Sequence, residues 1–211
     1  MTKYNIIYAD PAWNYDENWG NGSAHHHYES MTVDEIKNLP IKEIADKNCH
    51  LYLWYTNSFV REAHEVCDTW GFKYKQTLTW VKLYNNNKLQ TGLGYYFRGT
   101  TEHILFGVKG KLPRIRKDLI NVIETKGHAI YEKNSHFSQH SKKPNKFREL
   151  IVQHSGDLPR IELFARQKIP GWDYFGNDPR LTNQTDLHFQ SANNNNNNKN
   201  LINNLINNEG N

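Results

Sequence analysis

Residues 5–13 read NIIYADPAW, and this stretch decides the architecture that we expect. The apolar and aromatic run at positions 6–9 has the length of a strand that is buried on both faces of a sheet. Three chemically useful groups follow at once: the carboxylate of Asp10, the rigid backbone of Pro11 and the indole of Trp13. We therefore expect a buried strand that delivers these groups to one edge of a sheet.

This set of groups fits the methylation of an amino group on a flat base. The lone pair of an exocyclic amino nitrogen is conjugated into the ring, so an enzyme must turn it toward an electrophile with hydrogen-bond acceptors. The Asp10 carboxylate and the Pro11 carbonyl can accept the two N–H groups, and Trp13 can stack on the base, which is worth roughly 1–3 kcal/mol. The proton can leave to solvent or to Asp10 after transfer. The alternative is an ordinary Asp-Pro turn after a strand.

Strands and helices alternate along the chain, which favours an α/β fold. Apolar runs predict strands at residues 5–9, 51–55, 72–83, 103–108 and 161–165, the third of them long or bent. Helical spacing predicts helices at residues 57–70 and 144–154. We place Pro144 in the first turn of the second helix, with Phe147, Leu150 and Ile151 facing inward. The order predicts a single-domain, Rossmann-like doubly wound sheet with its site beyond the carboxyl ends of the strands.

A set of further segments accompanies the first motif in a fixed order, and together they carry a family resemblance. They are YADPAW (8–13), YESMT (28–32), LYLW (51–54), WVK (80–82), EHILFGVKG (102–110), SKKP (141–144), RIELFAR (160–166) and GN (176–177). From Asn5 to Asp178 the chain resembles the family of the eukaryotic mRNA adenosine methyltransferase (MT-A70-like) and related phage and bacterial adenine-N6 methyltransferases. One departure is Ala12, where the family usually has a second proline. That position shapes the loop, so we expect slower or altered chemistry at worst.

The resemblance implies S-adenosylmethionine as the cofactor and assigns residues to it. The methylating motif precedes the cofactor segment, which is the permuted order of this type of methyltransferase. Lys143 would bind the methionine carboxylate, Arg166 and Asn177 would hold the ribose region, and Glu162 would orient the basic group beside it. By residue type alone, Lys143 is one more surface lysine, and Glu162 with Arg166 is a structural ion pair.

The same resemblance places Tyr28 in a loop that closes near the cofactor and Glu102 at the start of a strand beside the target pocket. Tyr28 as a shield of the core edge and Glu102 as a strand cap are the structural alternatives. Methyl transfer from a sulfonium needs no metal. The run of histidines at residues 25–27 is a weak metal signal, because adjacent side chains point in different directions.

Basic residues are concentrated between Lys109 and Arg148, where eleven lysines and arginines stand against three acidic residues, an excess of 11 − 3 = 8. The whole chain carries a formal net charge of only +4. Such a segment suits a phosphate backbone, and we expect Arg114, Arg116 and Lys117 to bind nucleic acid from a loop or edge. A solvated basic surface is the alternative.

Composition bounds the remaining choices. The 211 residues suffice for one α/β domain. The two cysteines, Cys49 and Cys67, show no pairing or metal spacing, so we expect a reducing compartment: the cytoplasm, that of a host cell for a phage protein, or the nucleus in a eukaryote. No signal peptide or membrane span is expected. Gly20-Asn21-Gly22 and Gly92-Leu93-Gly94 lack the last glycine of a dinucleotide-binding loop.

The last thirty residues differ in character from the rest. Between Thr182 and Asn211, 13 of 30 residues are asparagine. This composition cannot bury enough apolar surface to order itself, so we expect a methyltransferase domain at residues 1–181 and a disordered tail at 182–211. Two LINN units, at 201–204 and 205–208, leave open a short partner-binding helix, which asparagine disfavours.

The sequence therefore predicts an S-adenosylmethionine-dependent adenine-N6 methyltransferase that acts on nucleic acid. DNA ranks above RNA, because the chain is compact and carries no added RNA-binding module. The partner class is nucleic acid, with a dimer formed with a second copy or a related subunit left open. The alternatives are an RNA methyltransferase, a non-catalytic partner subunit, and a methyltransferase for a small amine or protein glutamine.

Overall fold

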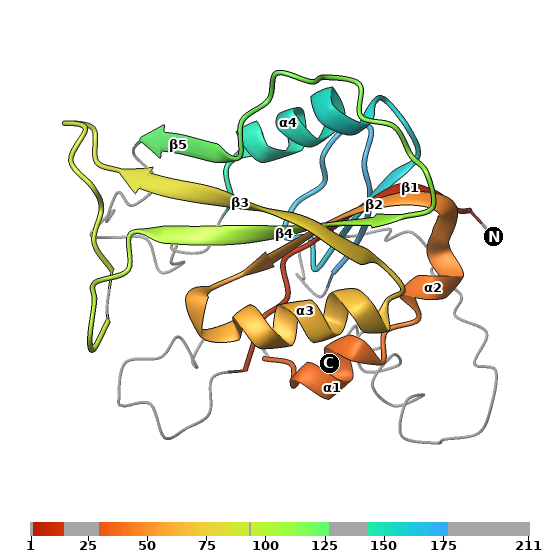
Figure 1. Cartoon of the computed structure of the whole chain (residues 1–211), viewed down its shortest axis with the longest axis horizontal. Helices are drawn as coiled ribbons and strands as arrows, with labels where there is room; N and C mark the ends of the chain where they lie inside the picture. The colour runs from red at the N-terminus through yellow and green to blue at the C-terminus, as the bar shows by residue number, and fades with distance from the viewer. Residues whose placement is uncertain (1, 15–29, 93, 127–142, 177–211) are drawn as a thin grey trace, which may run out of the picture.

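A seven-stranded mixed sheet forms the centre of the molecule in the computed structural model (Figure 1). The structure describes residues 2–14, 30–92, 94–126 and 143–176. Tyr28, Asn177, the histidines at 25–27 and the predicted tail lie outside these residues. The strands are β1 (Tyr4–Ala9), β2 (Ala45–Tyr55), β3 (Lys73–Leu83), β4 (Thr101–Lys109), β5 (Val122–Lys126), β6 (Arg160–Leu163) and β7 (Asp173–Phe175).

The sheet has the order β5-β3-β4-β2-β1-β6-β7. Strand β1 lies between β2 and β6 and is parallel to both, and β7 continues in the same direction beside β6. Strand β4 is antiparallel to its neighbours β2 and β3, and β5 is parallel to β3. Six strands therefore point the same way, and β4 alone among these seven runs against them.

Helices cover both faces of the sheet, as the doubly wound prediction requires. Below it in Figure 1 lie α1 (Val33–Lys37) and α3 (Val60–Thr69), which follows the 3-10 turn Asn57–Phe59, while α4 (Asn145–Ser155) lies above and α2 (Ile41–Ile44) leads into β2. Along β1 the side chains alternate between two cores: Ile7 and Ala9 pack on the α1 and α3 side, Ile6 and Tyr8 on the α4 side. Burial on both faces of β1 is thus confirmed.

The predicted elements exist, but their ends differ. Strand β2 begins six residues before the predicted Leu51, because its first half contains polar residues that break the apolar run. Pro144 caps α4 in an extended conformation (φ −60°, ψ 140°) instead of lying in its first turn. Strand β3 is eleven residues long, which agrees with the first of the two forms expected for it, and its pairing with β4 shifts register between Tyr74 and Gln76. The short elements α1, α2, β5 and β7 were missed, since each offers too few residues for a periodic pattern.

The topology defines one special position in the sheet. The chain leaves β1 and reaches β2 through α1 and α2, and it reaches β6 on the other side of β1 through α4. Crossovers on opposite faces diverge at the carboxyl end of β1, which is where open α/β sheets bind ligands. Asp10 is the first residue beyond that end. None of the helices in the described ranges is long and apolar enough to cross a membrane.

Candidate active site

Four charged side chains meet at the carboxyl edge of β1. Because β4 is antiparallel, its first residues lie at the same edge as the last residues of β2 and β3: His103 pairs with Tyr55, and Glu102 pairs with Trp80. This register brings Glu102 toward the end of β1. Lys143 reaches the same edge from the residue before the cap of α4.

The charged cluster consists of Asp10, Lys82, Glu102 and Lys143. The ammonium of Lys143 lies 2.9 Å from Asp10 Oδ1 and 3.3 Å from Glu102 Oε2, and the second Glu102 oxygen, Oε1, accepts a hydrogen bond from Lys82. The Lys143 side chain is 9% exposed, and both carboxylates are 17% exposed. Two lysines therefore neutralise two carboxylates in a largely buried setting.

The cluster keeps its charges through mutual attraction. Burial opposes the ammonium of Lys143, but Asp10 and Glu102 outweigh this and raise its pKa above the ordinary value. Burial likewise opposes the Glu102 carboxylate, yet Lys143 and Lys82 lower its pKa below the ordinary value. Both groups are therefore ionised at neutral pH, so the edge holds fixed charges of both signs beside Asp10.

Aromatic rings and a second ion pair lie between the charged cluster and the core on the α4 side of the sheet. Lys143 Nζ lies 4.9 Å from the centre of the Trp54 ring, and Trp54 Nε1 donates to the hydroxyl of Tyr8 at 2.7 Å. The guanidinium of Arg148 lies 5.6 Å from the Tyr8 ring centre. These contacts connect the charged cluster on the edge to the core between the sheet and α4.

The Glu162 carboxylate forms the second ion pair, with Arg148. Arg148 donates to both of its oxygens, from Nε at 2.7 Å and from the terminal NH2 nitrogen at 2.5 Å, and both residues are buried. Burial raises the pKa of Glu162, although Arg148 counteracts the effect. The basic group beside Glu162 is thus Arg148 of α4. The structural alternative paired Glu162 with Arg166, and that pairing is not the one found.

The turn after β1 is fixed by its own backbone. Trp13 N–H donates to the Pro11 carbonyl at 3.0 Å, and Met31 N–H donates to the Ala12 carbonyl at 2.8 Å, so residues 12–14 pair with the segment before α1. The turn therefore forms with alanine at position 12, where the family usually has a second proline. The carbonyl of Pro11 has a second lone pair with which it can accept another donor.

The Trp13 side chain is packed into the core next to the turn. Its indole N–H donates to the Trp54 carbonyl at 3.0 Å, and its ring stacks on Phe59 at 5.2 Å between centres. Only 8% of the residue is exposed. The indole joins the core, where it anchors the turn that carries Asp10, and the stacking of a base on Trp13 stays a prediction.

Arg166 reaches the site from the end of β6. Its positive charge acts on Lys143 and opposes the charge of that ammonium, so the two cations lie near each other. The backbone before it is tightly constrained: Phe164 has φ 60°, a region that costs about 1–2 kcal/mol for a residue other than glycine. Gly176 packs so closely on Ala165 that a Cβ there would overlap its backbone.

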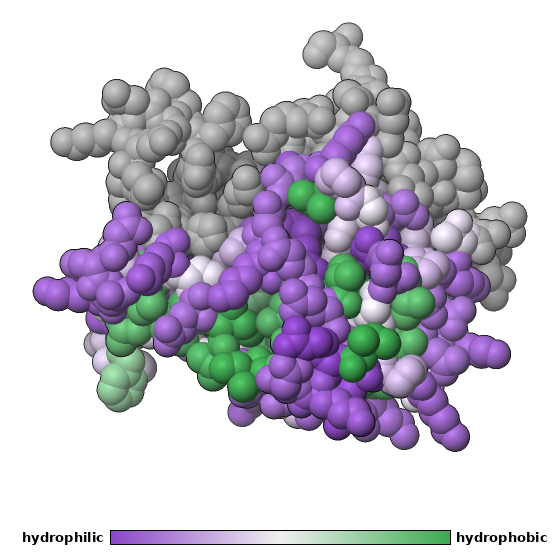
Figure 2. Space-filling view, turned by 90° about the horizontal axis from the view of Figure 1, so that it is seen from above, coloured by the Kyte–Doolittle hydropathy of each residue, from purple (hydrophilic) through white to green (hydrophobic). Residues whose placement is uncertain are grey.

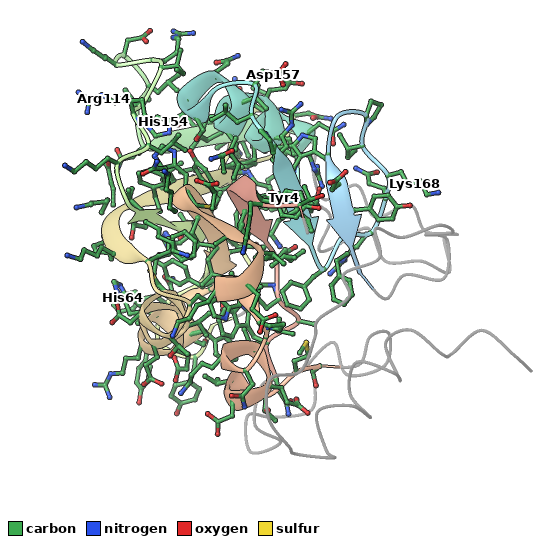
Figure 3. The ribbon with its side chains drawn as sticks, turned by 90° about the vertical axis from the view of Figure 1, so that its right-hand side faces the viewer. Tyr4, His64, Arg114, His154, Asp157 and Lys168 are labelled. Carbon is green, nitrogen blue, oxygen red and sulfur yellow. The ribbon has the colours of Figure 1, made fainter. Side chains whose placement is uncertain are left out.

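The loop that carries the predicted phosphate-binding residues begins at the opposite edge of the sheet from the charged cluster. Strand β4 runs away from the cluster, so the loop after it begins at the far end of the sheet, about 30 Å away by strand length. Ile115 N–H donates to the carbonyl of His154 at the end of α4, and Arg114 and His154 lie near each other in Figure 3. Arg116 pairs with Asp118 in this exposed loop, where Lys117 lies between them. The structure therefore does not bring this loop to Asp10.

Two residues of the site were missed from the sequence. Lys82 lay inside a recognised segment, WVK, but nothing in the chain order indicates that β3 lies beside β4. Arg148 was considered only as one of many basic residues, and nothing in the sequence indicated a buried partner for it. Among the described residues there is no group of three histidines, cysteines or carboxylates that could hold a metal ion.

Comparison with known proteins identifies the family to which the chain is similar. The MT-A70 family model matches residues 4–178. The type II methyltransferase M.MunI of a Mycoplasma species is 30% identical over 195 residues, which cover 82% of this chain and 77% of that protein. A putative N(6)-adenosine-methyltransferase MT-A70-like of Medicago truncatula is 28% identical over 185 residues, 84% of this chain and 26% of that protein.

A third relative is described differently. The N6-adenosine-methyltransferase non-catalytic subunit MTB of Arabidopsis thaliana is 31% identical over 134 residues, 62% of this chain and 16% of that protein. This chain thus spans about three quarters of M.MunI but small fractions of the two plant proteins.

Proposed function

The chain belongs to the MT-A70 family, and on that premise we propose that it transfers a methyl group from S-adenosylmethionine to the N6 amino group of adenine in nucleic acid. The observation that carries the proposal is the position of Asp10 and Pro11. They follow the central strand β1 at the topological switch point, beside the buried cluster of Lys82, Glu102 and Lys143.

Asp10 and Pro11 orient the amino group. The carboxylate of Asp10 accepts one N–H and the carbonyl of Pro11 accepts the other, so the nitrogen lone pair turns toward the methyl donor. The contact to Lys143 fixes one Asp10 oxygen, and the Trp13 anchor fixes the backbone that carries both acceptors. After transfer the extra proton leaves to Asp10 or to solvent, and no metal takes part.

The residues present fit the cofactor as well. S-adenosylmethionine supplies the electrophilic methyl group on its sulfonium and carries a carboxylate and a ribose. Lys143 places a positive charge at this edge, which suits the carboxylate of the cofactor. Arg166 and Asn177, the two residues that the resemblance assigns to it, hold the ribose region. Glu162 acts indirectly, because it holds Arg148 and thereby the start of α4 next to Lys143.

DNA is the favoured substrate. The compact chain spans most of M.MunI, a type II methyltransferase, and only a quarter of the plant adenosine enzyme. Arg114, Arg116 and Lys117 then contact phosphates well away from the target base, from the far end of the sheet. An RNA substrate is the second candidate, supported by the relatives named as adenosine methyltransferases.

A non-catalytic role is the main competitor, since the relative MTB is named as a non-catalytic subunit. Such a subunit has no need for a buried set of charges around the acceptor. Here Asp10, Glu102 and Lys143 are all present and mutually paired. This argues for an active chain.

The deciding experiment is incubation of the purified chain with labelled S-adenosylmethionine and matched DNA and RNA pools, followed by mass analysis of the nucleosides. N6-methyladenine in one pool supports the proposal and selects the substrate. Cofactor binding without methylation of either pool contradicts it and points to a partner-dependent or non-catalytic subunit. The variant Asp34→Asn, at an exposed carboxylate of α1, controls for nonspecific effects of charge loss when Asp10→Asn is assayed.

A further inference from the structure

Three consecutive aromatic residues stand in solvent in the connection between β3 and β4. Tyr95, Tyr96 and Phe97 are 86%, 83% and 90% exposed. Single exposed aromatic residues are ordinary, but three in a row form a contiguous apolar surface that water disfavours. We call residues 94–98 the aromatic tip.

The backbone of the connection holds these rings outward. Gly92 N–H donates to the Gly99 carbonyl at 2.6 Å, and Arg98 Nε donates to the Gly92 carbonyl at 2.5 Å, so the two sides of the tip are closed against each other. At Gly94 a Cβ would overlap the carbonyl of Phe97, which shows how tightly the chain turns. The rings of Tyr95 and Tyr96 meet edge to face at 4.9 Å between centres. The exposed rings are therefore part of a built turn.

The connection that carries the aromatic tip joins two strands of the candidate active site. The connection leaves β3 directly after Lys82 and Leu83 and re-enters β4 just before Glu102, so both of its ends lie at the charged cluster. Hydrogen bonds tie its base to the site strand: Gln90 N–H donates to the Lys82 carbonyl, and Lys82 N–H donates to the Thr100 carbonyl. Figure 1 shows this connection projecting at the left, at the edge where β3 and β5 end.

We propose that the aromatic tip stacks on bases of the nucleic acid substrate that flank the target adenine. Aromatic rings stack on unpaired bases of any sequence, and an arginine beside them adds attraction to bases and phosphates. Arg98 belongs to the aromatic tip, Lys88 belongs to the connection that carries the tip, and Lys82 belongs to the charged cluster. Apolar side chains also reach the surface at this end of the molecule in the view from above (Figure 2).

The inference rests on the proposed function and adds a substrate-binding surface to it. A base turned out of a duplex loses its stacking partners, and the neighbouring bases lose one face each. The tip supplies aromatic faces at that point.

The test uses the full chain and a short single-stranded DNA oligonucleotide that carries 2-aminopurine next to a central adenine. The triple variant Tyr95→Ala, Tyr96→Ala, Phe97→Ala is compared with wild type and with Tyr74→Ala, which removes an exposed tyrosine from the opposite end of β3. Circular dichroism checks folding, and the single variant Phe97→Ala provides a milder change.

The expected result is a rise of about tenfold or more in the oligonucleotide KM of the triple variant, a smaller rise for Phe97→Ala and none for Tyr74→Ala. The cofactor KM stays unchanged. Wild type quenches the 2-aminopurine fluorescence and the triple variant does not.

Unchanged KM and quenching in the triple variant, with wild type methylating the oligonucleotide, overturn the aromatic tip and leave the proposed function standing. A wild-type dimer that the triple variant dissociates, with an unchanged KM, overturns it in favour of contact with a second copy. A wild type that neither binds nor methylates DNA or RNA overturns both proposals.

Discussion

Asp10 is positioned by a neighbour that is itself held in place. Lys143 contacts Asp10 on one side and Glu102 on the other, and Lys82 holds the second oxygen of Glu102. These four side chains form a row of alternating charges, and each side chain is held in place by its neighbour in the row. The geometry of the acceptor therefore depends on residues from three strands and the start of α4.

Removing the charge of Asp10 tests its role directly. Asp10→Asn keeps the size of the side chain but replaces the oxygen pair with one acceptor and one donor, so an amino group meets a donor where it needs an acceptor. We expect a loss of about 100-fold or more in kcat, measured by transfer of labelled methyl groups. Thermal unfolding close to wild type shows that the fold survives, and a residual rate near wild type would reject the assignment.

A variant of Lys143 can distinguish an effect on cofactor binding from an effect on substrate binding. In Lys143→Met the apolar stem remains on Trp54 but the positive charge near Arg166 is lost. We expect the apparent KM for S-adenosylmethionine to rise well before that for nucleic acid. Lys146→Met, three residues further along at an exposed position in the first turn of α4, serves as the matched control. The reverse order of effects would show that Lys143 serves the substrate instead.

At the scale of elements, α4 is held on the sheet by a buried ion pair. Arg148 binds both oxygens of Glu162 on β6, and also contacts Asn145 at the first residue of the helix. The pair therefore sets where α4 begins, and Lys143 precedes that point by two residues. Its contribution to the site is made through packing, and a stability measurement can isolate it.

Breaking the pair leaves a buried charge. In Arg148→Met the carboxylate of Glu162 loses its cation, so we expect the free energy of unfolding to fall by about 3–5 kcal/mol, measured by urea denaturation. Arg61→Met on the exposed side of α3 is the control and should change it by less than about 0.5 kcal/mol. The double variant Arg148→Met, Glu162→Leu should recover part of the loss. Equal stability of Arg148→Met and wild type would mean that water replaces the guanidinium.

The sequence predicted elements whose apolar runs were long, and it failed where pairing decides the outcome. Strand β1 and helix α3 follow from their own residues. Strands β5 and β7 are five and three residues long and exist because a neighbour supplies their hydrogen bonds. The reversed direction of β4 likewise cannot be seen in its composition. That reversal brings Glu102 to the site and carries the basic loop to the other edge.

In the candidate site as well, the sequence predicted individual residues but not the contacts that depend on the fold of the whole molecule. Residue chemistry pointed to Asp10, and the resemblance assigned Glu102 and Lys143 separately; in the fold, Lys143 lies close to both carboxylates. It could not give the partner of Glu162, because that depends on the rotation of α4 against β6. Trp13 was assigned to the base from its residue type, whereas packing of the whole core decided that it is covered.

A polar network at the far end of the sheet makes the stability of the whole molecule depend on pH. His50 is buried, its Nε2 donates to the Leu112 carbonyl at 3.0 Å, and its Nδ1 meets Ser155 Oγ at 2.8 Å. Tyr52 joins this network through Ser155 and through Nδ1 of His154 on α4. Burial lowers the pKa of His50 to about 4, and burial together with Arg114 lowers that of His154.

The sign of the dependence follows from proton uptake. In the unfolded chain histidine binds its proton near pH 6.5, whereas folded His50 resists it until about pH 4. Between these values the unfolded state binds more protons, so this contribution is complete above pH 6.5 and is lost as the pH falls toward 4. Urea denaturation at pH 7 and pH 5 should show lower stability at pH 5, and His50→Gln should reduce the difference. A difference as large in the variant as in wild type would assign the effect to other groups.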